Sequence, residues 1–341
     1  MTTNPPVASA QTPPQPEANA TPHENPLPTA ARVTHYVTKY GVIGLLALLL
    51  LATTIFTDGF WSGDNLKNIL TQNAPIALVS IGMTFVIISG VFDLSVGAIF
   101  AAGAVVYAKL SGSMPLIDAA ILTLLVGVGA GLINGIIVTR LNVDPFIGTI
   151  GTGGAFAGLV LVYTNSQPIL VEDEGFRGLG LGHILGIPAP VVVAGIAFLI
   201  GGLLLSRTVF GRYIYASGGN PEAARLAGIP VDGVRVIAYI LVALGAIAGG
   251  MITASQLSIG QPSLGVNTAL DAFTIVVIGG TSVYGGRGAI WRTLVGVLIL
   301  ATLTAFFNFL ALEGAWQQLA KGVVLIGAVA LDALHHRSAR R

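Results

Sequence analysis

Two carboxylates lie within long runs of apolar side chains, and they are the first residues whose type could carry chemistry. Asp93 is the only charged residue between Asn73 and Lys109, and Asp271 opens a later apolar run. Removing an ionised side chain from water is costly, so a carboxylate in such a run is a candidate functional residue. Each aspartate also has a structural alternative. Its side chain could cap the following helix through backbone N–H groups, for Asp93 those of Val96 or its neighbours.

Three uncharged polar residues in other apolar runs are further candidates. Asn134 lies beside small residues that share one helix face at a spacing of four, namely Gly127, Gly131 and Gly135. Its amide could bond a neighbouring helix or line a polar path. Thr149 and Thr152 present a similar choice, since a threonine hydroxyl in a helix commonly bonds a carbonyl of its own helix.

The motifs of common enzyme active sites are missing from the sequence. No lysine completes a Gly-x-x-x-x-Gly phosphate loop, no serine sits in Gly-x-Ser-x-Gly, and no histidines have the His-Glu-x-x-His spacing of a zinc site. The absence of cysteine excludes disulfides and thiolate metal sites. We therefore predict no catalytic residue, no metal and no cofactor bound by this chain, which leaves transport or a channel.

The composition indicates a membrane protein. Of the 341 residues, 54% are hydrophobic and 9% are charged, against about 25% charged in an average soluble domain. Such a chain lacks the polar surface of a cytosolic enzyme, a nucleic-acid binder or a secreted disulfide scaffold. The net charge of +1 points to no polyanionic partner. The 45 glycines suit close helix contacts in lipid.

Long apolar blocks, without the alternation of barrel strands, predict an all-α integral membrane protein. The run from Asn73 to Lys109 would measure about 52 Å as one helix, too long for a single crossing, so it must break near residues 90–97, around Asp93. The block before Arg287 is short and could be re-entrant. We predict about ten transmembrane helices, at 40–57, 74–90, 94–110, 115–139, 145–163, 187–206, 233–254, 268–283, 288–310 and 315–334.

The basic residues predict the orientation of these spans. With the amino terminus in the cytoplasm, Lys67, Lys109 and Arg177 lie outside and Lys321 lies within the last block. Twelve others lie inside, namely Arg32, Lys39, Arg140, Arg207, Arg212, Arg225, Arg235, Arg287, Arg292, Arg337, Arg340 and Arg341. This excess satisfies the positive-inside rule and predicts that both termini are cytoplasmic.

The two ends of the chain differ from its middle. Eight of the 17 prolines lie in the first 30 residues, among small and polar side chains that could not form a core. We predict a disordered Pro-rich cytoplasmic tail at 1–35, a single transmembrane domain at 36–336, and a basic cytoplasmic tail at 337–341.

The predicted cytoplasmic loop at 207–232 contains a short helix. Asn220, Pro221 and Glu222 are typical of a cap, a first helical position and an acidic first turn, and Gly228 is typical of a helix end. A helix of two turns is too short to be stable alone. It is either a capped surface connector or an element that docks on a partner.

A weak internal similarity links two distant segments. Residues 84–90 (TFVIISG) and 274–280 (TIVVIGG) agree at four of seven positions, and each precedes a Gly-Ala-Ile, at 97–99 and 288–290. The predicted topology makes the two copies parallel, so it does not indicate an inverted repeat.

Several motifs, in the same order, resemble those of the ribose-type monosaccharide permeases of ABC importers. They are Gly82–Gly90 followed by Asp93–Gly97, Asn134-Gly135, Asp144–Ile147 with Thr149, Gly218–Ile229, Leu270–Ala272, Val277–Thr281 and Gly285–Gly288. The resemblance runs from about residue 65 to 334. These permeases are the sugar branch of a family that also contains branched-chain amino acid permeases. The chain departs from the pattern at Val91-Phe92, at Ala269 and near Gly158, which leaves the sugar open.

The resemblance implies an ABC importer permease fold in the bacterial inner membrane and import of a monosaccharide or small polyol. It implies three partners besides lipid: a second permease chain, a cytoplasmic ATPase that uses ATP and Mg²⁺, and a periplasmic sugar-binding protein. The chain itself would not be an enzyme. An ABC permease for another small solute, such as a branched-chain amino acid, is the alternative, followed by an ion-coupled secondary carrier and a membrane scaffold.

The resemblance also suggests roles for individual residues. The ATPase-coupling helix would comprise Gly219, Asn220, Pro221, Glu222, Ala223, Ala224, Arg225 and Gly228. The candidates for the translocation path or gate are Asp93, Asn134, Thr149, Thr152 and Asp271. For Asp271 the resemblance favours a structural or gate role near the outer mouth.

Overall fold

The computed structural model describes residues 29–57 and 59–338. Contacts within the chain divide it into residues 1–41 and 42–341, and the core and the polar clusters belong to the second unit. Residues 1–28 and 339–341, which contain most of the two predicted tails, lie outside the described residues. Helix α1 begins at Thr29, inside the segment that the composition predicts to be disordered.

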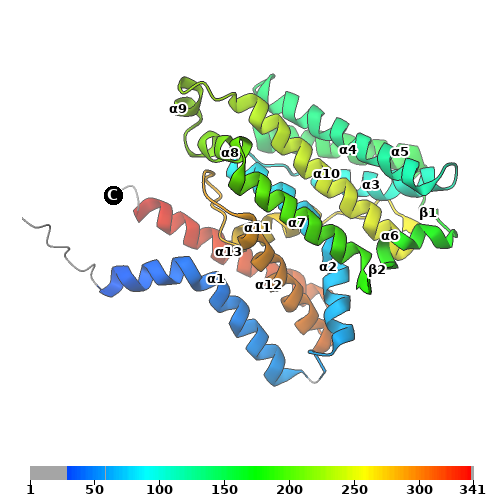
Figure 1. The fold of residues 1–341 in the computed structure, drawn as a ribbon, viewed down its shortest axis with the longest axis horizontal. Helices are drawn as coiled ribbons and strands as arrows, with labels where there is room; N and C mark the ends of the chain where they lie inside the picture. Colours follow the sequence, from blue (N-terminus) through cyan, green and yellow to red (C-terminus); the bar gives the residue numbers. More distant parts are fainter. Residues whose placement is uncertain (1–28, 58, 339–341) are drawn as a thin grey trace, which may run out of the picture. The chain divides into compact units, whose positions relative to one another are not determined.

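The described residues are mostly helical (Figure 1). The long helices are α1 (Thr29–Phe56), α2 (Gly63–Ile88), α3 (Val96–Ser111), α4 (Leu116–Thr139), α5 (Pro145–Thr164), α7 (Ala189–Arg207), α10 (Val231–Leu257), α12 (Ile290–Phe309) and α13 (Gly314–Ser338). The short ones are the 3-10 helix η1 (Glu174–Arg177), α6 (Gly178–Leu181), α8 (Val209–Gly219), α9 (Pro221–Leu226) and α11 (Thr268–Ile278). Each of the ten predicted apolar blocks overlaps a helix.

The described residues are mostly helical, as predicted, and they also contain four two-residue strands. Strand β1 (Ile169–Leu170) pairs antiparallel with β4 (Ile259–Gly260), and β2 (His183–Ile184) pairs antiparallel with β3 (Ile187–Pro188). These two-residue ladders lie in and beside the connection between α5 and α7. In a segment this short, pairing depends on tertiary contacts and leaves no periodic pattern in the sequence.

Six described helices are long and apolar enough to cross a membrane: α2, α4, α5, α7, α10 and α12. The apolar part of α1 (Gly41–Phe56), α3 and α11 are shorter. Helix α11 spans only 11 residues, about 16 Å at 1.5 Å per residue, which is half the thickness of the hydrocarbon core. It ends at Ile278 because Gly279 and the left-handed Gly280 follow. The count of ten crossings therefore stays a prediction.

The predicted interruption around Asp93 is confirmed. Helix α2 ends at Ile88 and α3 begins at Val96, so residues 89–95 form a non-helical linker between two apolar helices.

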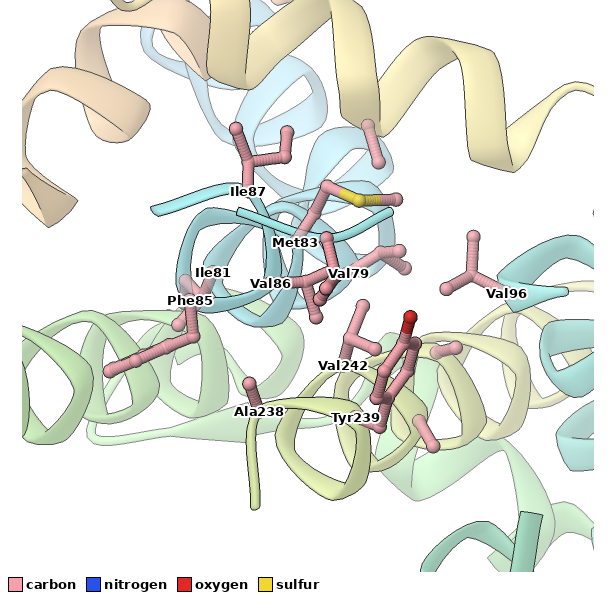
Figure 2. Packing of buried hydrophobic residues seen from close by; sticks show 14 of the residues in the cluster. Val79, Ile81, Met83, Phe85, Val86, Ile87, Val96, Ala238, Tyr239 and Val242 are labelled. Atoms are coloured by element: carbon pink, nitrogen blue, oxygen red, sulfur yellow. The ribbon is translucent and has the colours of Figure 1, made fainter. Parts of the chain in front are cut away.

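The core is built around α10, which packs against α2, α3 and α4. Buried side chains of α2 such as Val86 and Met83 pack with Tyr239 and Val242 of α10 in one cluster (Figure 2). Glycines let the backbones approach. A Cβ on Gly131 of α4 would lie 2.6 Å from the Cα of Ile240, inside van der Waals contact. The predicted stripe of small residues on α4 is therefore a contact surface for α10.

This packing predicts that Gly131→Ala destabilises the protein by about 1–3 kcal/mol, because the added methyl group meets backbone atoms of α10. A matched control is Gly195→Ala on α7, where a Cβ would have no atom within 4 Å. Thermal unfolding of the purified protein in detergent should show a lower midpoint for Gly131→Ala alone. Equal midpoints for both variants would contradict the close α4–α10 contact.

Candidate functional site

The end of α2 has a specific hydrogen-bond pattern. Ser89 N donates to Phe85 O at 3.0 Å, Gly90 N to Ile87 O at 3.0 Å, and Val91 N to Val86 O at 3.3 Å. Gly90 has a φ of 79°, in the left-handed region that glycine adopts without strain. This is the glycine-terminated end that closes many helices.

The end of α11 repeats this pattern bond for bond. Gly279 N donates to Ile275 O at 2.9 Å, Gly280 N to Val277 O at 2.8 Å, and Thr281 N to Val276 O at 3.2 Å. Gly280 has a φ of 89°. In both places a non-helical linker then leads into another apolar helix, α3 or α12. The weak sequence similarity thus marks a repeated structural unit, two interrupted helix pairs.

Side chains from α4 and the linker itself form a buried polar cluster at the first interruption. Asp93, only 1% exposed, accepts hydrogen bonds from Ser95 N at 2.8 Å and Ser95 Oγ at 2.6 Å through one carboxylate oxygen. Asn134 Nδ2 donates to the other oxygen at 3.2 Å and to Ser95 Oγ at 2.7 Å. Of the two interpretations of Asp93, the local structural one fits this geometry: the carboxylate binds the N–H of Ser95, next to Val96, and ties it to α4.

Three further side chains hold the linker from other helices. Thr149 Oγ of α5 accepts a hydrogen bond from Leu94 N at 3.1 Å. From α10, the Tyr239 hydroxyl donates to Phe92 O at 2.9 Å, and Arg235 Nε donates to Ser89 O at 3.4 Å.

The sequence did not single out Tyr239 or Arg235 for this site. The signal that could have found them is a polar group in an otherwise apolar helix. Thr152 does not join the cluster, because its hydroxyl donates to Thr149 O at 3.3 Å within the same helix.

Four glycines bring the two interruptions and the α8 segment together, and we call Gly90, Gly218, Gly285 and Gly286 the glycine junction. Gly286 N donates to Ile88 O at 2.8 Å, which joins the second linker to the end of α2. A Cβ on Gly285 would lie 3.0 Å from Gly90 Cα, and one on Gly218 would lie 2.7 Å from Gly286 N. The Tyr215 hydroxyl of α8 donates to Gly288 O at 2.8 Å. The backbone of α8 is thus in direct contact with both linkers.

Helix α9 follows directly on this junction. The Asn220 side chain accepts a hydrogen bond from Ala223 N at 3.0 Å, Pro221 holds the first helical position, and Gly228 has a φ of 79°. The predicted cap and end of this helix are therefore confirmed. Ala224 is buried, while Leu226 is 91% exposed.

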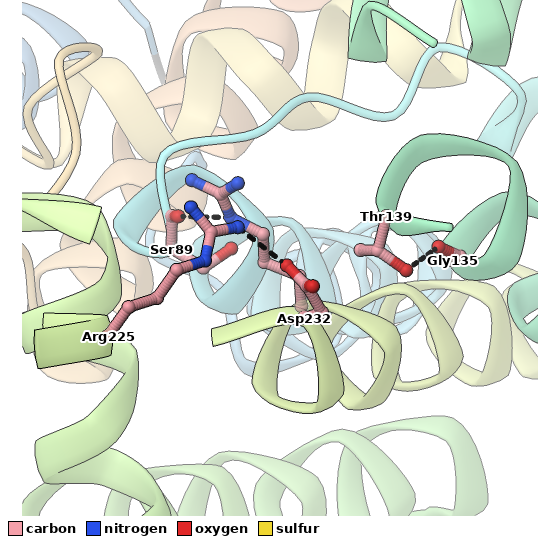
Figure 3. Close-up of polar contacts among 6 residues, drawn as sticks. Ser89, Gly135, Thr139, Arg225 and Asp232 are labelled. Carbon is pink, nitrogen blue, oxygen red and sulfur yellow. Dashed lines mark hydrogen bonds and ion pairs between the residues drawn. The ribbon is translucent and has the colours of Figure 1, made fainter. Parts of the chain in front are cut away.

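An exposed ion pair joins α9 to the first turn of α10. Arg225 pairs with Asp232 at 2.7 Å, and a dashed line marks this contact in Figure 3. The prediction of a single short helix in this loop is wrong, because a second helix, α8, precedes α9. Its start at Thr208, whose hydroxyl accepts from Gly211 N at 3.1 Å, was the missed signal.

Asp271 lies apart from these residues. Its two carboxylate oxygens accept hydrogen bonds from Nζ of Lys321, on α13, at 3.2 and 3.1 Å. Asp332, further along α13, accepts hydrogen bonds from Ser282 Oγ at 3.1 Å and Val283 N at 3.0 Å. Two carboxylate contacts therefore fasten α13 to the two ends of the α11 segment.

A cavity of about 350 Å³ lies beside the first interruption, between α3, α5 and the segment before α11. Leu94, Gly97, Gly153, Pro262 and Ala269 are among its lining residues. None of the five polar residues predicted for the path lines it. Asp93, Asn134 and Thr149 are buried and take part in the hydrogen bonds that hold the linker at 89–95.

The buried cluster makes a specific prediction for Asp93. Asp93→Ala removes the acceptor for three hydrogen bonds and should lower the free energy of unfolding by about 1–3 kcal/mol. Asp93→Asn keeps one acceptor oxygen and should cost less. Unfolding by SDS titration in mixed micelles measures both, and a smaller loss for Asp93→Ala than for Asp93→Asn would contradict this network.

Comparison with known proteins agrees with this architecture. The family model described as the branched-chain amino acid transport system / permease component matches residues 65–329. No solved structure matches the chain.

The relatives in this family include three proteins named for sugars. The chain is 42% identical to the ribose import permease protein of Bacillus subtilis (strain 168) over 86% of this chain and 92% of that protein. It is 35% identical to the L-arabinose transport system permease protein of Escherichia coli (strain K12), over 89% and 92%. It is 34% identical to the D-allose transport system permease protein of the same strain, over 87% of this chain and 92% of that protein.

The match covers the long helices except α1, the first two residues of α2 and the end of α13, and it covers every motif on which the resemblance was based. Together with the long apolar helices, it makes the protein a multi-pass protein of the bacterial inner membrane. The chain belongs to the binding-protein-dependent permease family of ABC importers, the family of branched-chain amino acid transport system permease components.

Proposed function

We propose that this chain is the membrane-spanning subunit of an ATP-driven importer, and that it passes a monosaccharide or related small polyol delivered by a periplasmic binding protein. The observation that carries the proposal is the position of α9, an exposed two-turn helix fixed through the glycine junction to both interrupted helix pairs. The relatives named for ribose, L-arabinose and D-allose support a sugar as substrate.

The same proposal includes ten membrane crossings with both termini in the cytoplasm. The short helices α3 and α11 would complete their crossings with the extended linkers that join them to their neighbours. The positive-inside distribution supports this orientation. It puts α8, α9 and the glycine junction on the cytoplasmic side, where a partner ATPase binds ATP and Mg²⁺.

In this arrangement α9 is the coupling helix. Glu222, Ala223 and Leu226 are exposed and would contact a groove of the ATPase, whereas the buried Ala224 fastens the helix to its own subunit. Closure of a pair of ATPase subunits would displace α9. Because the junction consists of backbone in direct contact, with no flexible side chain between, that displacement would reach the linkers after α2 and α11.

The translocation path would run along the cavity between α3 and α5, with a second permease chain completing it. Asp93, Asn134 and Thr149 would then act indirectly, by holding the linker at 89–95 in place. Thr152 would support Thr149. Asp271, paired with Lys321, would anchor α11 and act as a gate element only through movement of α13.

Charge reversal on α9 tests its role as the coupling helix. Glu222→Arg should leave ATP hydrolysis by the assembled complex in place and lower sugar uptake at least about tenfold, because α9 would no longer fit its groove. Uptake and hydrolysis are measured together in proteoliposomes with the ATPase and the binding protein. Glu313→Arg, a charge reversal at another exposed glutamate, between α12 and α13, is the control. Full uptake in Glu222→Arg would rule out the coupling role.

Substitutions at the junction test transmission beyond α9. Gly218→Ala places a methyl group against Ile88 O and should reduce the sugar transported per ATP about tenfold. Tyr215→Phe removes only the hydrogen bond to Gly288 O and should reduce the same ratio about threefold. Gly202→Ala on α7, which meets no atom within 4 Å, is the control. A ratio unchanged in both junction variants would show that the junction does not transmit the motion.

A further inference from the structure

A lateral groove separates α4 from α5 on the surface of α3. The two helices both pack on α3 but enclose between them a cavity of about 400 Å³. Ala102 of α3 and Ile247 of α10 contribute to its lining, with Val126 and Ile133 from α4 and Leu159 from α5. The lining is almost entirely apolar. Val126, Ile133 and Leu159 are each at least 44% exposed, so the groove opens to the side of the helix bundle.

A second cavity, of about 570 Å³, adjoins the end of this groove. It is lined by the carboxyl end of α3 and the turn after it, including Lys109, Ser111 and Ser113, and by residues 169–173 of the connection after α5. Tyr163 lines both cavities, so the apolar groove meets the polar cavity at the end of α5. Together the two cavities match the polarity of an amphiphilic molecule, because an apolar channel leads to a polar end.

The polar cavity carries charges of both signs. Lys109 supplies an ammonium group, and Glu172 and Asp173 supply carboxylates. Within the described part of the chain, the Lys109 and Glu172 side chains have no hydrogen-bond or ion-pair partner. These side chains are exposed, and a single zwitterionic ligand would pair with both signs of charge at once. A primary ammonium can donate hydrogen bonds to carboxylates and a phosphate can accept them from lysine, whereas a choline group cannot donate.

We propose that the groove binds one zwitterionic phospholipid of the phosphatidylethanolamine type. An acyl chain lies between α4 and α5, the phosphate faces Lys109, and the ethanolamine ammonium faces Glu172 and Asp173. The occupant is a membrane lipid because the groove opens laterally among exposed apolar side chains of a membrane protein, where acyl chains are the surrounding solvent. This site is separate from the junction and does not depend on the proposed transport activity.

Native mass spectrometry tests the site. The protein is reconstituted in nanodiscs with equal parts of phosphatidylethanolamine, phosphatidylcholine and phosphatidylglycerol, then released into the gas phase, and the retained lipids are identified. We expect one phosphatidylethanolamine per chain. Gly129→Leu should reduce its retention about tenfold, because Gly129 lines the groove with open space at its Cβ and displacing two methylene groups suffices for that loss.

Two further variants distinguish binding of the acyl chain in the groove from recognition of the head group. Gly195→Leu makes the same substitution at an exposed glycine of α7 with open space at its Cβ, and should retain the lipid as the unchanged protein does. Glu172→Lys should shift the retained lipid from phosphatidylethanolamine towards phosphatidylglycerol. Size-exclusion profiles and thermal unfolding midpoints identify any variant that fails to fold.

Three results would overturn the proposal. The first is equal retention of all three lipids by the unchanged protein, which would show no head-group site. The second is full retention in a folded Gly129→Leu variant. The third is a lipid-free groove together with a change of oligomer mass in Gly129→Leu, which would show that a second copy of the chain covers this face.

Discussion

The structure depends on one constraint: a helix that is interrupted among apolar side chains leaves backbone groups that water cannot satisfy. Between α2 and α3 these groups find partners within the protein. Phe92 O is bonded by Tyr239, Leu94 N by Thr149, and Ser95 N by Asp93. Ile88 O and Ser89 O are bonded by Gly286 N and Arg235. The groups that bond this linker thus come from α5, from α10, from the second linker and from the first linker itself.

The second interruption is satisfied in the same way but by different residues. Val283 N is bonded by Asp332 of α13, Gly280 O by Arg292 at 3.2 Å, and Gly288 O by Tyr215. Because these partners belong to α8, α12 and α13, the carboxyl-terminal helices are required to support the linker. Lys321 and Asp271, at the other end of α11, add a partly buried ion pair, whose role is to fix α13 in place.

The sequence predicted the elements whose signals are local. The apolar blocks, the interruption near Asp93, and the Asn220 cap with the Gly228 end each follow from hydropathy or from the chemistry of a few adjacent residues. The small strands were missed, because contacts with distant segments decide them. Helix α8 was missed although the cap at Thr208 is a local signal. The shortness of the block that contains α11 was visible in the sequence. Pairing of Asp93 with Asn134 and of Asp271 with Lys321 joins residues that are far apart in the chain, and no spacing rule could have found either. The repeat at residues 84–90 and 274–280 was visible but weak, and its significance is in the backbone pattern.

The bond from Gly286 N to Ile88 O has a consequence for how the chain changes shape. Two interrupted helices that each had two arrangements would give four combinations if they were independent. The backbone contact at the junction raises the free energy of the two combinations in which only one linker has moved. Moving one linker alone breaks this bond and the close glycine contacts. If each linker has two arrangements, this coupling favours the two combinations in which both linkers move together, so that a displacement of one linker is carried to the other.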